Sequence, residues 1–259
     1  MLGTLADFNL NENQTHEFTF VDQCILNELA NIENKVHEYY DTYQFANALS
    51  LMVNFLQVDL SGFYLDMAKD ILYCDAINSL RRRQVQTVIY KVCESLAKLL
   101  APIIPHTAEE IYSNFIGKDK ESIFLTKYEF VKNEVNEVLA NQYEHFTTLR
   151  NAVLKALEEK RAEKIIGKSI DASLKLHVKD EVIKDIVNSM DEDTLQHIFI
   201  VSKVTLSDCE CGLVDYNVAS LNVDVNDGVI CERCWNRISK EDILEGNLCK
   251  RCYDVVNGK

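Results

Sequence analysis

The feature that most constrains this chain is a pair of Cys-x-x-Cys motifs, Cys-Glu-Arg-Cys at residues 231–234 and Cys-Lys-Arg-Cys at residues 249–252. Two intervening residues place both sulfurs of a motif on one tight turn, and the fourteen residues between the motifs let the second fold back onto the first. Four thiolates suit Zn²⁺, and four protein ligands leave no position for a catalytic water. The spacing therefore predicts a small ribbon around one structural zinc ion. The predicted ligands are Cys231, Cys234, Cys249 and Cys252.

The other cysteines follow no such pattern. Cys24, Cys74 and Cys93 stand singly among apolar neighbours, which is typical of free thiols rather than of a disulfide framework. Cys209 and Cys211 are separated by only one residue, which fits a metal-binding turn poorly. They are either alternative ligands or thiols that take no part in metal binding, and the spacing favours the second interpretation.

Composition sets limits on the compartment and on the partners. Hydrophobic residues make up 47% of the 259 positions, enough for a substantial core. No apolar run reaches the roughly 18–20 residues that cross a bilayer, and the N-terminal residues lack the basic region and apolar core of a secretory signal. A cytoplasmic protein without membrane contact is expected. The net charge of −14 argues against nucleic-acid binding, but residues 150–184 hold nine basic and six acidic residues. The local charge of residues 150–184 is therefore compatible with a partner that carries phosphate groups, despite the negative charge of the whole chain.

Regularly spaced apolar residues predict long helices between residues 18 and 146. They recur every three or four positions, which places their side chains on one helix face. The stripes are Ile25, Leu29, Ile32 and Val36; Phe45, Leu49, Met52, Val53 and Leu56; and Val85, Val88, Ile89, Val92, Leu96 and Leu99. Several such helices joined by short breaks predict a bundle.

The prolines mark a break between two helices. Both lie in the segment Ala-Pro-Ile-Ile-Pro at residues 101–105, which should end the third helix. Thr107 and Glu110 then have the spacing of a capping box, so we expect the next helix to begin there. His106 and Glu109 have no nucleophile nearby in sequence, and no catalytic residue is expected.

The pattern changes after residue 150 to alternating helices and strands. Residues 150–166 predict a helix closed by Gly167, and residues 170–178 alternate apolar and polar side chains as a half-buried strand does. A second helix is expected at residues 182–190 and further strands at residues 198–206, 213–218 and 221–225.

These patterns predict a mainly α protein with four consecutive parts. Residues 1–17 form a linker, residues 18–149 a helical bundle, residues 150–226 a small α+β junction module and residues 227–259 the zinc ribbon.

Several residues near these motifs have alternative interpretations. Trp235 directly follows a predicted ligand and is flanked by Arg233 and Arg237, so it either packs on the ribbon or stacks on an unpaired base. Residues 81–83 are three arginines, which form either a solvated helix start or an RNA backbone contact. Lys168 lies in a Gly-Lys-Ser sequence that lacks the earlier glycine and the strand-to-helix context of a phosphate-binding loop, so no nucleotide site is expected there.

Several segments resemble the C-terminal region of bacterial-type isoleucyl-tRNA synthetases. Residues 2–8 (LGTLADF) resemble the stretch that leaves the catalytic domain, and residues 58–66 (VDLSGFYLD) and 100–111 (LAPIIPHTAEEI) are similar to the anticodon-binding bundle of class I synthetases. Residues 156–169, with Ala-Leu-Glu, Arg161 and Ile-Gly-Lys-Ser, and the two cysteine motifs with Trp235 are similar to the isoleucyl family in particular.

The resemblance implies recognition of tRNA(Ile) by one region of an isoleucine–tRNA ligase. In the family the bundle packs along the anticodon stem, and the arginine and tryptophan matching Arg233 and Trp235 take part in reading the anticodon loop. The predicted tRNA-binding residues are Arg233, Trp235, Arg237, Arg251, Lys168, Arg161 and Arg81. The resemblance also implies a monomeric parent enzyme whose catalytic and editing domains are the partners of this region.

The ATP-binding motifs His-Ile-Gly-His and Lys-Met-Ser-Lys-Ser of the parent family do not occur in this sequence, so the chain alone is expected to lack catalytic activity. Two other functions remain open. A DNA-repair glycosylase ends in a similar zinc ribbon, but its nucleophile is a proline after the initiator methionine, where this chain has Leu2. A free-standing zinc-ribbon module that binds protein or RNA is the remaining alternative.

Overall fold

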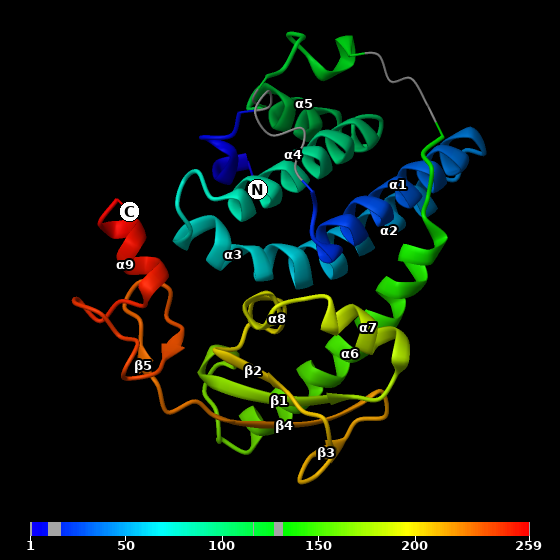
Figure 1. Cartoon of the computed structure of the whole chain (residues 1–259). Coiled ribbons are helices and arrows are strands. Elements are labelled where there is room, and N and C mark those ends of the chain that lie inside the picture. Colours follow the sequence, from blue (N-terminus) through cyan, green and yellow to red (C-terminus); the bar gives the residue numbers. More distant parts are fainter. Residues whose placement is uncertain (1, 10–16, 116, 127–131, 259) are drawn as a thin grey trace. The chain divides into compact units, whose positions relative to one another are not determined.

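The computed structural model describes residues 2–9, 17–115, 117–126 and 132–258 (Figure 1). These group into two compact units: unit 1 is Met1–Leu72 with Ala76–Ala140, and unit 2 is Tyr73–Asp75 with Asn141–Lys259. The chain is mainly helical, with a small mixed sheet and a C-terminal group of four cysteines, which confirms the predicted fold class. The four-part division stays a prediction, and parts of its linker, bundle and ribbon (residues 1, 10–16, 116, 127–131 and 259) lie outside the described residues.

Unit 1 is a helical bundle. Its helices are η1 (Leu2–Leu5), α1 (Phe20–Asp41), α2 (Phe45–Asn54), the π-helix η2 (Phe55–Tyr64), α3 (Leu65–Cys74, which ends in unit 2), α4 (Leu80–Leu100), α5 (Pro105–Ser113) and η3 (Ile123–Leu125). The predicted stripes on α1 and α4 are confirmed, because every one of their residues is at most 6% exposed.

The predicted stripe on α2 is partly wrong. Phe45 and Val53 are 47% and 37% exposed, whereas Ala48, Met52 and Phe55 are at most 1% exposed. The buried residues are spaced as on one helix face, but the first of them is Ala48. The predicted stripe counted only larger apolar residues and therefore left Ala48 out. Phe45 instead lies against the ring of Tyr40, with 5.6 Å between the ring centroids.

The continuous helical run Phe45–Cys74 is long and apolar enough, by length and composition alone, to cross a membrane, with a mean hydropathy of 1.3. A core helix of a folded domain meets the same criterion, so a single run of this kind is weak grounds for a span. Met52, Phe55, Leu60 and Tyr64 are at most 1% exposed and belong to the core. The absence of membrane contact stays a prediction.

A buried carboxylate organises the start of α1. Asp22 is fully buried and accepts hydrogen bonds from the Tyr64 hydroxyl at 2.6 Å and from Arg81 Nη1 at 2.5 Å. Thr19 caps the helix, because its backbone N–H donates to Asp22 Oδ2 at 3.1 Å while its own hydroxyl accepts from the Asp22 N–H. Tyr64, Arg81 and Thr19 thus donate to one charge that could not be buried alone.

The arginine run at residues 81–83 forms ion pairs rather than a solvated helix start. Arg82 Nη1 lies 2.5 Å and Arg83 Nη1 3.3 Å from Asp7 Oδ2. The Arg82 hydrogen bond is the largest of the effects that lower the pKa of Asp7 to about 2. Residues 6–9, which follow η1, are thereby attached to α4.

The start predicted for α5 is wrong. The helix begins at Pro105, two residues before the expected capping box at Thr107. Proline suits the first helical position because its missing N–H would have no partner there. Within α5, Glu109 accepts hydrogen bonds from the Ser122 hydroxyl at 2.8 Å and the Ile123 N–H at 3.0 Å, and these bonds stabilise the start of η3.

Unit 2 combines helices with a mixed sheet. Its elements are most of α6 (Glu137–Ala162), then η4 (Ser169–Asp171), β1 (Ala172–Val178), α7 (Glu181–Asn188), α8 (Glu192–Phe199), β2 (Lys203–Leu206), β3 (Val214–Asp215), β4 (Ala219–Val225), β5 (Val229–Ile230), β6 (Arg237–Ile238) and α9 (Lys250–Val256). The sheet has the order β2-β1-β4-β3, with β1 parallel to β2 and antiparallel to β4. β5 and β6 form a separate two-stranded hairpin.

The alternation predicted for residues 170–178 is confirmed on β1, where every second side chain from Ala172 is buried. The predicted closure of α6 by Gly167 is wrong. Lys164 adopts the left-handed conformation with φ of 59°, and the Ile165 N–H donates to the Lys160 carbonyl at 3.0 Å. The turn that normally uses glycine is therefore completed three residues earlier by a lysine. The strand expected at residues 198–206 begins only at Lys203, because α8 continues to Phe199.

We predict that Arg81→Gln lowers the free energy of unfolding by about 3–5 kcal/mol, because it leaves the buried Asp22 carboxylate without its guanidinium partner. Lys69→Gln is the matched control, since its ion pair with Asp66 is exposed and should contribute less than about 1 kcal/mol. Urea denaturation of both variants measures the difference. Equal losses would show that Arg81 is no more important to the fold than a surface lysine.

Candidate metal centre

The four predicted ligands lie on two short turns of unit 2. Cys231 and Cys234 are in the loop that joins β5 to β6, and Cys249 is the N-cap of α9, which carries Cys252. The first turn is closed by the Trp235 N–H, which donates to the Cys231 carbonyl at 2.9 Å. Gly228 is required beside it, since a Cβ there would meet the Ile238 carbonyl oxygen at 2.6 Å.

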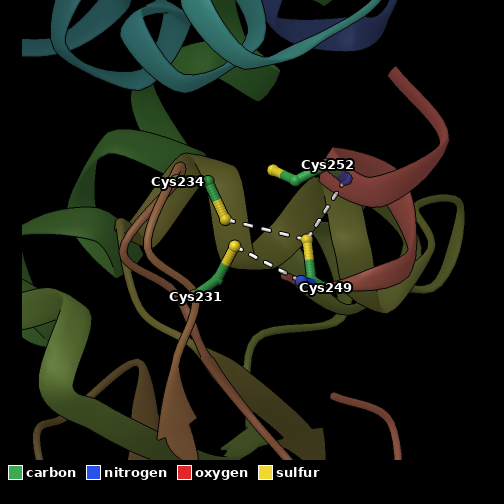
Figure 2. A group of neighbouring side chains, drawn as sticks. All are labelled: Cys231, Cys234, Cys249 and Cys252. Atoms are coloured by element: carbon green, nitrogen blue, oxygen red, sulfur yellow. Dashed lines mark hydrogen bonds between the residues drawn. The ribbon is translucent and has the colours of Figure 1, made fainter. Parts of the chain in front are cut away.

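The four sulfurs converge on one point (Figure 2). They lie within 4.8 Å of one another, and all four cysteines are buried. Cys234 Sγ and Cys249 Sγ are 3.8 Å apart. Two sulfurs bound to one zinc ion at about 2.3 Å with tetrahedral angles would be separated by about 3.8 Å. A disulfide needs about 2.05 Å. The cysteines therefore fit a single tetrahedral metal ion.

Backbone N–H groups and an arginine point at the sulfurs, as expected around thiolates. The Cys249 N–H lies 3.3 Å from Cys231 Sγ, and Arg233 Nη1 lies 3.6 Å from Cys252 Sγ. A hydrogen bond from Cys249 lowers the pKa of Cys234 to about 4, and the same bond raises the pKa of Cys249. Cys234 is thereby stabilised as thiolate, the form that binds metal, whereas Cys249 and Cys252, whose pKa values are raised, would lose their protons to a bound metal ion.

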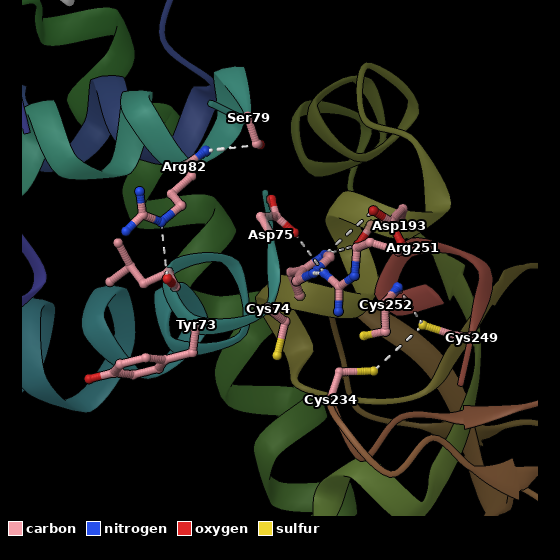
Figure 3. A network of polar contacts seen from close by, with 12 residues as sticks. Tyr73, Cys74, Asp75, Ser79, Arg82, Asp193, Cys234, Cys249, Arg251 and Cys252 are labelled. Atoms are coloured by element: carbon pink, nitrogen blue, oxygen red, sulfur yellow. Dashed lines mark hydrogen bonds and ion pairs between the residues drawn. The ribbon is translucent and has the colours of Figure 1, made fainter. Parts of the chain in front are cut away.

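The arginine inside each motif contacts other groups of unit 2, and Figure 3 shows Arg251 beside Asp75. Arg233 donates to the backbone carbonyls of Cys74 and, at 3.2 Å, of Tyr73. Arg251 lies 3.2 Å from Asp75 Oδ1 and 3.3 Å from His197 Nε2. Both side chains attach the ribbon to Tyr73–Asp75. Sequence reasoning missed this segment, because nothing in its local pattern indicates a contact more than 150 residues away.

The remaining predicted tRNA-binding residues fall into two groups. Arg237 pairs with Asp171 at 2.8 Å, Arg161 contacts Glu158 and the Ser169 hydroxyl, and Arg81 lies in unit 1 with Asp22, as described above. These guanidinium groups have protein partners. Their contacts with tRNA stay predictions.

Trp235 and Lys168 form the second group. The Trp235 side chain is 65% exposed, with a backbone φ of 64°. Lys168 Nζ lies 5.9 Å from the centre of its ring. The structure thus brings together an exposed aromatic face and a positive charge that are 67 positions apart in sequence. This arrangement is suited to a planar ligand that carries negative charge.

Cys209 and Cys211 do not join the metal centre. Both are exposed, and in the part of the chain that the structure describes the only metal-capable group of cysteines consists of the four predicted ligands. A hydrogen bond from the Cys211 backbone lowers the pKa of Cys209. The interpretation that these two thiols take no part in metal binding agrees with this placement.

Residues 22–178 match the family described as the anticodon-binding domain of tRNA ligase. The chain is 41% identical over 248 residues to isoleucine–tRNA ligase 1 of Oceanobacillus iheyensis, a match that covers 95% of this chain and 27% of the relative. It is 40% identical over 238 residues to isoleucine–tRNA ligase of Macrococcus caseolyticus and 42% identical over 242 residues to that of Bacillus cytotoxicus, each covering 91% of this chain and 26% of the relative. The chain therefore spans about a quarter of the length of these curated relatives.

We predict that the purified chain carries a single equivalent of zinc and that Cys249→Ser abolishes stoichiometric binding, because a tetrahedral site loses one of its four ligands. Cys211→Ser is the matched control and should retain the metal. Elemental analysis after dialysis measures both. Full zinc occupancy in Cys249→Ser, or loss in Cys211→Ser, would contradict the proposed ligand set.

Proposed function

The chain belongs to the family of anticodon-binding domains of tRNA ligases, and we propose that it is the tRNA-recognition region of an isoleucine–tRNA ligase. The observation that carries the proposal is the match of 91–95% of the chain to isoleucine–tRNA ligases at about 40% identity. The resemblance identified from the sequence motifs is thereby confirmed. The bundle and the ribbon would then act on one ligand, tRNA(Ile).

The metal in this proposal is zinc, held by Cys231, Cys234, Cys249 and Cys252. Its role would be structural, since it would cross-link two turns that share little other core. Among the described residues, Cys74 is the one buried residue that joins the four cysteines in their cluster, and Ile238 and Leu248 pack against it. The ribbon would thereby hold Trp235 at a fixed position on the surface.

Trp235 would supply the main contact with an anticodon base. Its exposed ring can stack on any unpaired base, and Lys168 beside it can neutralise an adjacent phosphate. Arg233 and Arg251 would act as positioning residues for the ribbon, because their guanidinium groups already contact Tyr73–Asp75. Arg237, Arg161 and Arg81 would reach phosphates only with those nitrogens that their carboxylate partners leave unoccupied.

The parent protein, in this proposal, attaches isoleucine to its tRNA at the expense of ATP, acts as a monomer in the cytoplasm and carries catalysis and editing in other domains. We propose that residues 18–149 bind the anticodon stem and that residues 227–259 reach the anticodon loop. Residues 150–226 would join these two parts. The alternative, a free-standing interaction module, is not favoured, since the matched relatives are isoleucine–tRNA ligases. That module would not distinguish tRNA(Ile) from other polyanions.

We predict that Trp235→Ala weakens binding of tRNA(Ile) by about 1–3 kcal/mol, the usual contribution of one base stacked on an aromatic side chain. Val214→Ala is the control, because Val214 is an exposed apolar residue (53%) of β3, in the part proposed only to join the two ends. Filter binding at a fixed salt concentration measures both affinities. An unchanged affinity in Trp235→Ala would limit the tryptophan to packing on Lys168.

A further inference from the structure

Unit 1 contains a cavity of about 970 Å³ that takes no part in the metal centre or in the proposed anticodon contacts. It is lined by one face of α4, by Tyr112 of α5 and by residues of the segment 117–126. Cavities of roughly 300–1,000 Å³ are typical of small-molecule and cofactor sites in proteins. This one is therefore large enough for a complete small ligand.

The floor of the cavity is aromatic. Phe8, Tyr90, Tyr112 and Phe115 all line it, and each is 5–7% exposed. The ring of Tyr90 lies 5.2 Å from that of Phe8 and 4.7 Å from that of Phe115, measured between centroids. The ring planes are tilted by 32° and 55°, so the floor is a cluster of inclined rings, which a planar aromatic group can meet face-on or edge-on.

The rim of the cavity is positively charged. Four lysines line it against two carboxylates, Glu94 and Asp119, although the whole chain has a net charge of −14. Lys98 lies 2.8 Å from Glu94, and Lys120 lies 3.9 Å from Asp119. Two of the four lysines thus have a carboxylate partner, and the other two give the cavity a local excess of positive charge.

Lys91 and Lys118 supply the excess. Lys91 Nζ lies 5.4 Å from the centre of the Phe18 ring, and Lys118 donates to the Ser113 carbonyl at 2.6 Å. Within the described ranges neither ammonium group has a carboxylate at ion-pair distance. A lysine whose partner is a neutral ring or carbonyl keeps its charge available for a phosphate.

We propose that this cavity binds a nucleoside phosphate, with the base on the aromatic floor and the phosphate at Lys91 and Lys118. An apolar ligand would desolvate the ammonium groups without compensation, and inorganic phosphate alone would leave the aromatic floor unused. The nucleotide is either free or part of an RNA strand, since both present the same chemistry. The proposal does not rest on anticodon recognition, because all its residues belong to unit 1 and Trp235 belongs to unit 2.

The test is equilibrium dialysis of the full zinc-loaded chain against labelled AMP, adenosine, inorganic phosphate and a short single-stranded oligoadenylate. We expect saturable binding of AMP that is stronger than binding of adenosine or phosphate. The double variant Lys91→Gln/Lys118→Gln should weaken it about tenfold or more, because charge-assisted hydrogen bonds to the phosphate are lost.

Lys35→Gln/Lys69→Gln is the matched control, since it removes the same charge from unit 1 outside the cavity and should leave AMP binding unchanged. Thermal unfolding of both double variants checks that they fold.

If the oligoadenylate binds more tightly than AMP and its binding depends on Lys91 and Lys118, the site is assigned to an RNA strand. If AMP binds more tightly and depends on the same lysines, the site is assigned to a free nucleotide. The proposal is overturned if neither binds in a lysine-dependent way, or if adenosine or phosphate binds as tightly as AMP. Trp235→Ala should leave AMP binding intact, so failure here is distinct from failure of anticodon recognition.

Discussion

The convergence of four cysteine sulfurs is the constraint on which the C-terminal part of unit 2 depends. The segment after β4 contains only short strands and one seven-residue helix, and its buried cluster consists of cysteines with Ile238 and Leu248 at the edge. So little apolar area cannot offset the conformational entropy of ordering the chain. A structural zinc ion in a four-thiolate site contributes on the order of 10–16 kcal/mol of apparent binding energy in small domains. With zinc bound as proposed, metal binding and folding of this segment would be one event.

The same constraint determines what the surface can present. Trp235 is 65% exposed because it follows Cys234 in a turn whose backbone is held by the Cys231 carbonyl. Arg233 points inward to Cys252 and to the carbonyls of Tyr73 and Cys74. Arg233 thus holds the ribbon in place, whereas Trp235, two residues later, exposes an aromatic ring. The tRNA-binding role proposed for Trp235 depends on this exposure.

The sequence was most informative where the physical signal is local. The cysteine spacing predicted that the four sulfurs lie together, and the stripes on α1 and α4 predicted the core, since both depend on short-range patterns in the sequence. The start of α5 at Pro105 and the end of α6 at Lys164 were missed, because proline and a left-handed lysine replaced the expected threonine and glycine. Partners distant in sequence, such as Asp22 with Arg81 and Arg237 with Asp171, leave no local pattern and needed the structure.

The most direct test of the account is a filter-binding titration of the zinc-loaded chain against tRNA(Ile) and a non-cognate tRNA at two salt concentrations, repeated after the metal is chelated. The account predicts a preference for tRNA(Ile) that persists at the higher salt concentration and disappears with the zinc, because phosphate contacts are screened whereas base contacts are not. Equal binding of both tRNAs by the zinc-loaded chain, or a preference that survives chelation, would contradict recognition through the four-cysteine ribbon.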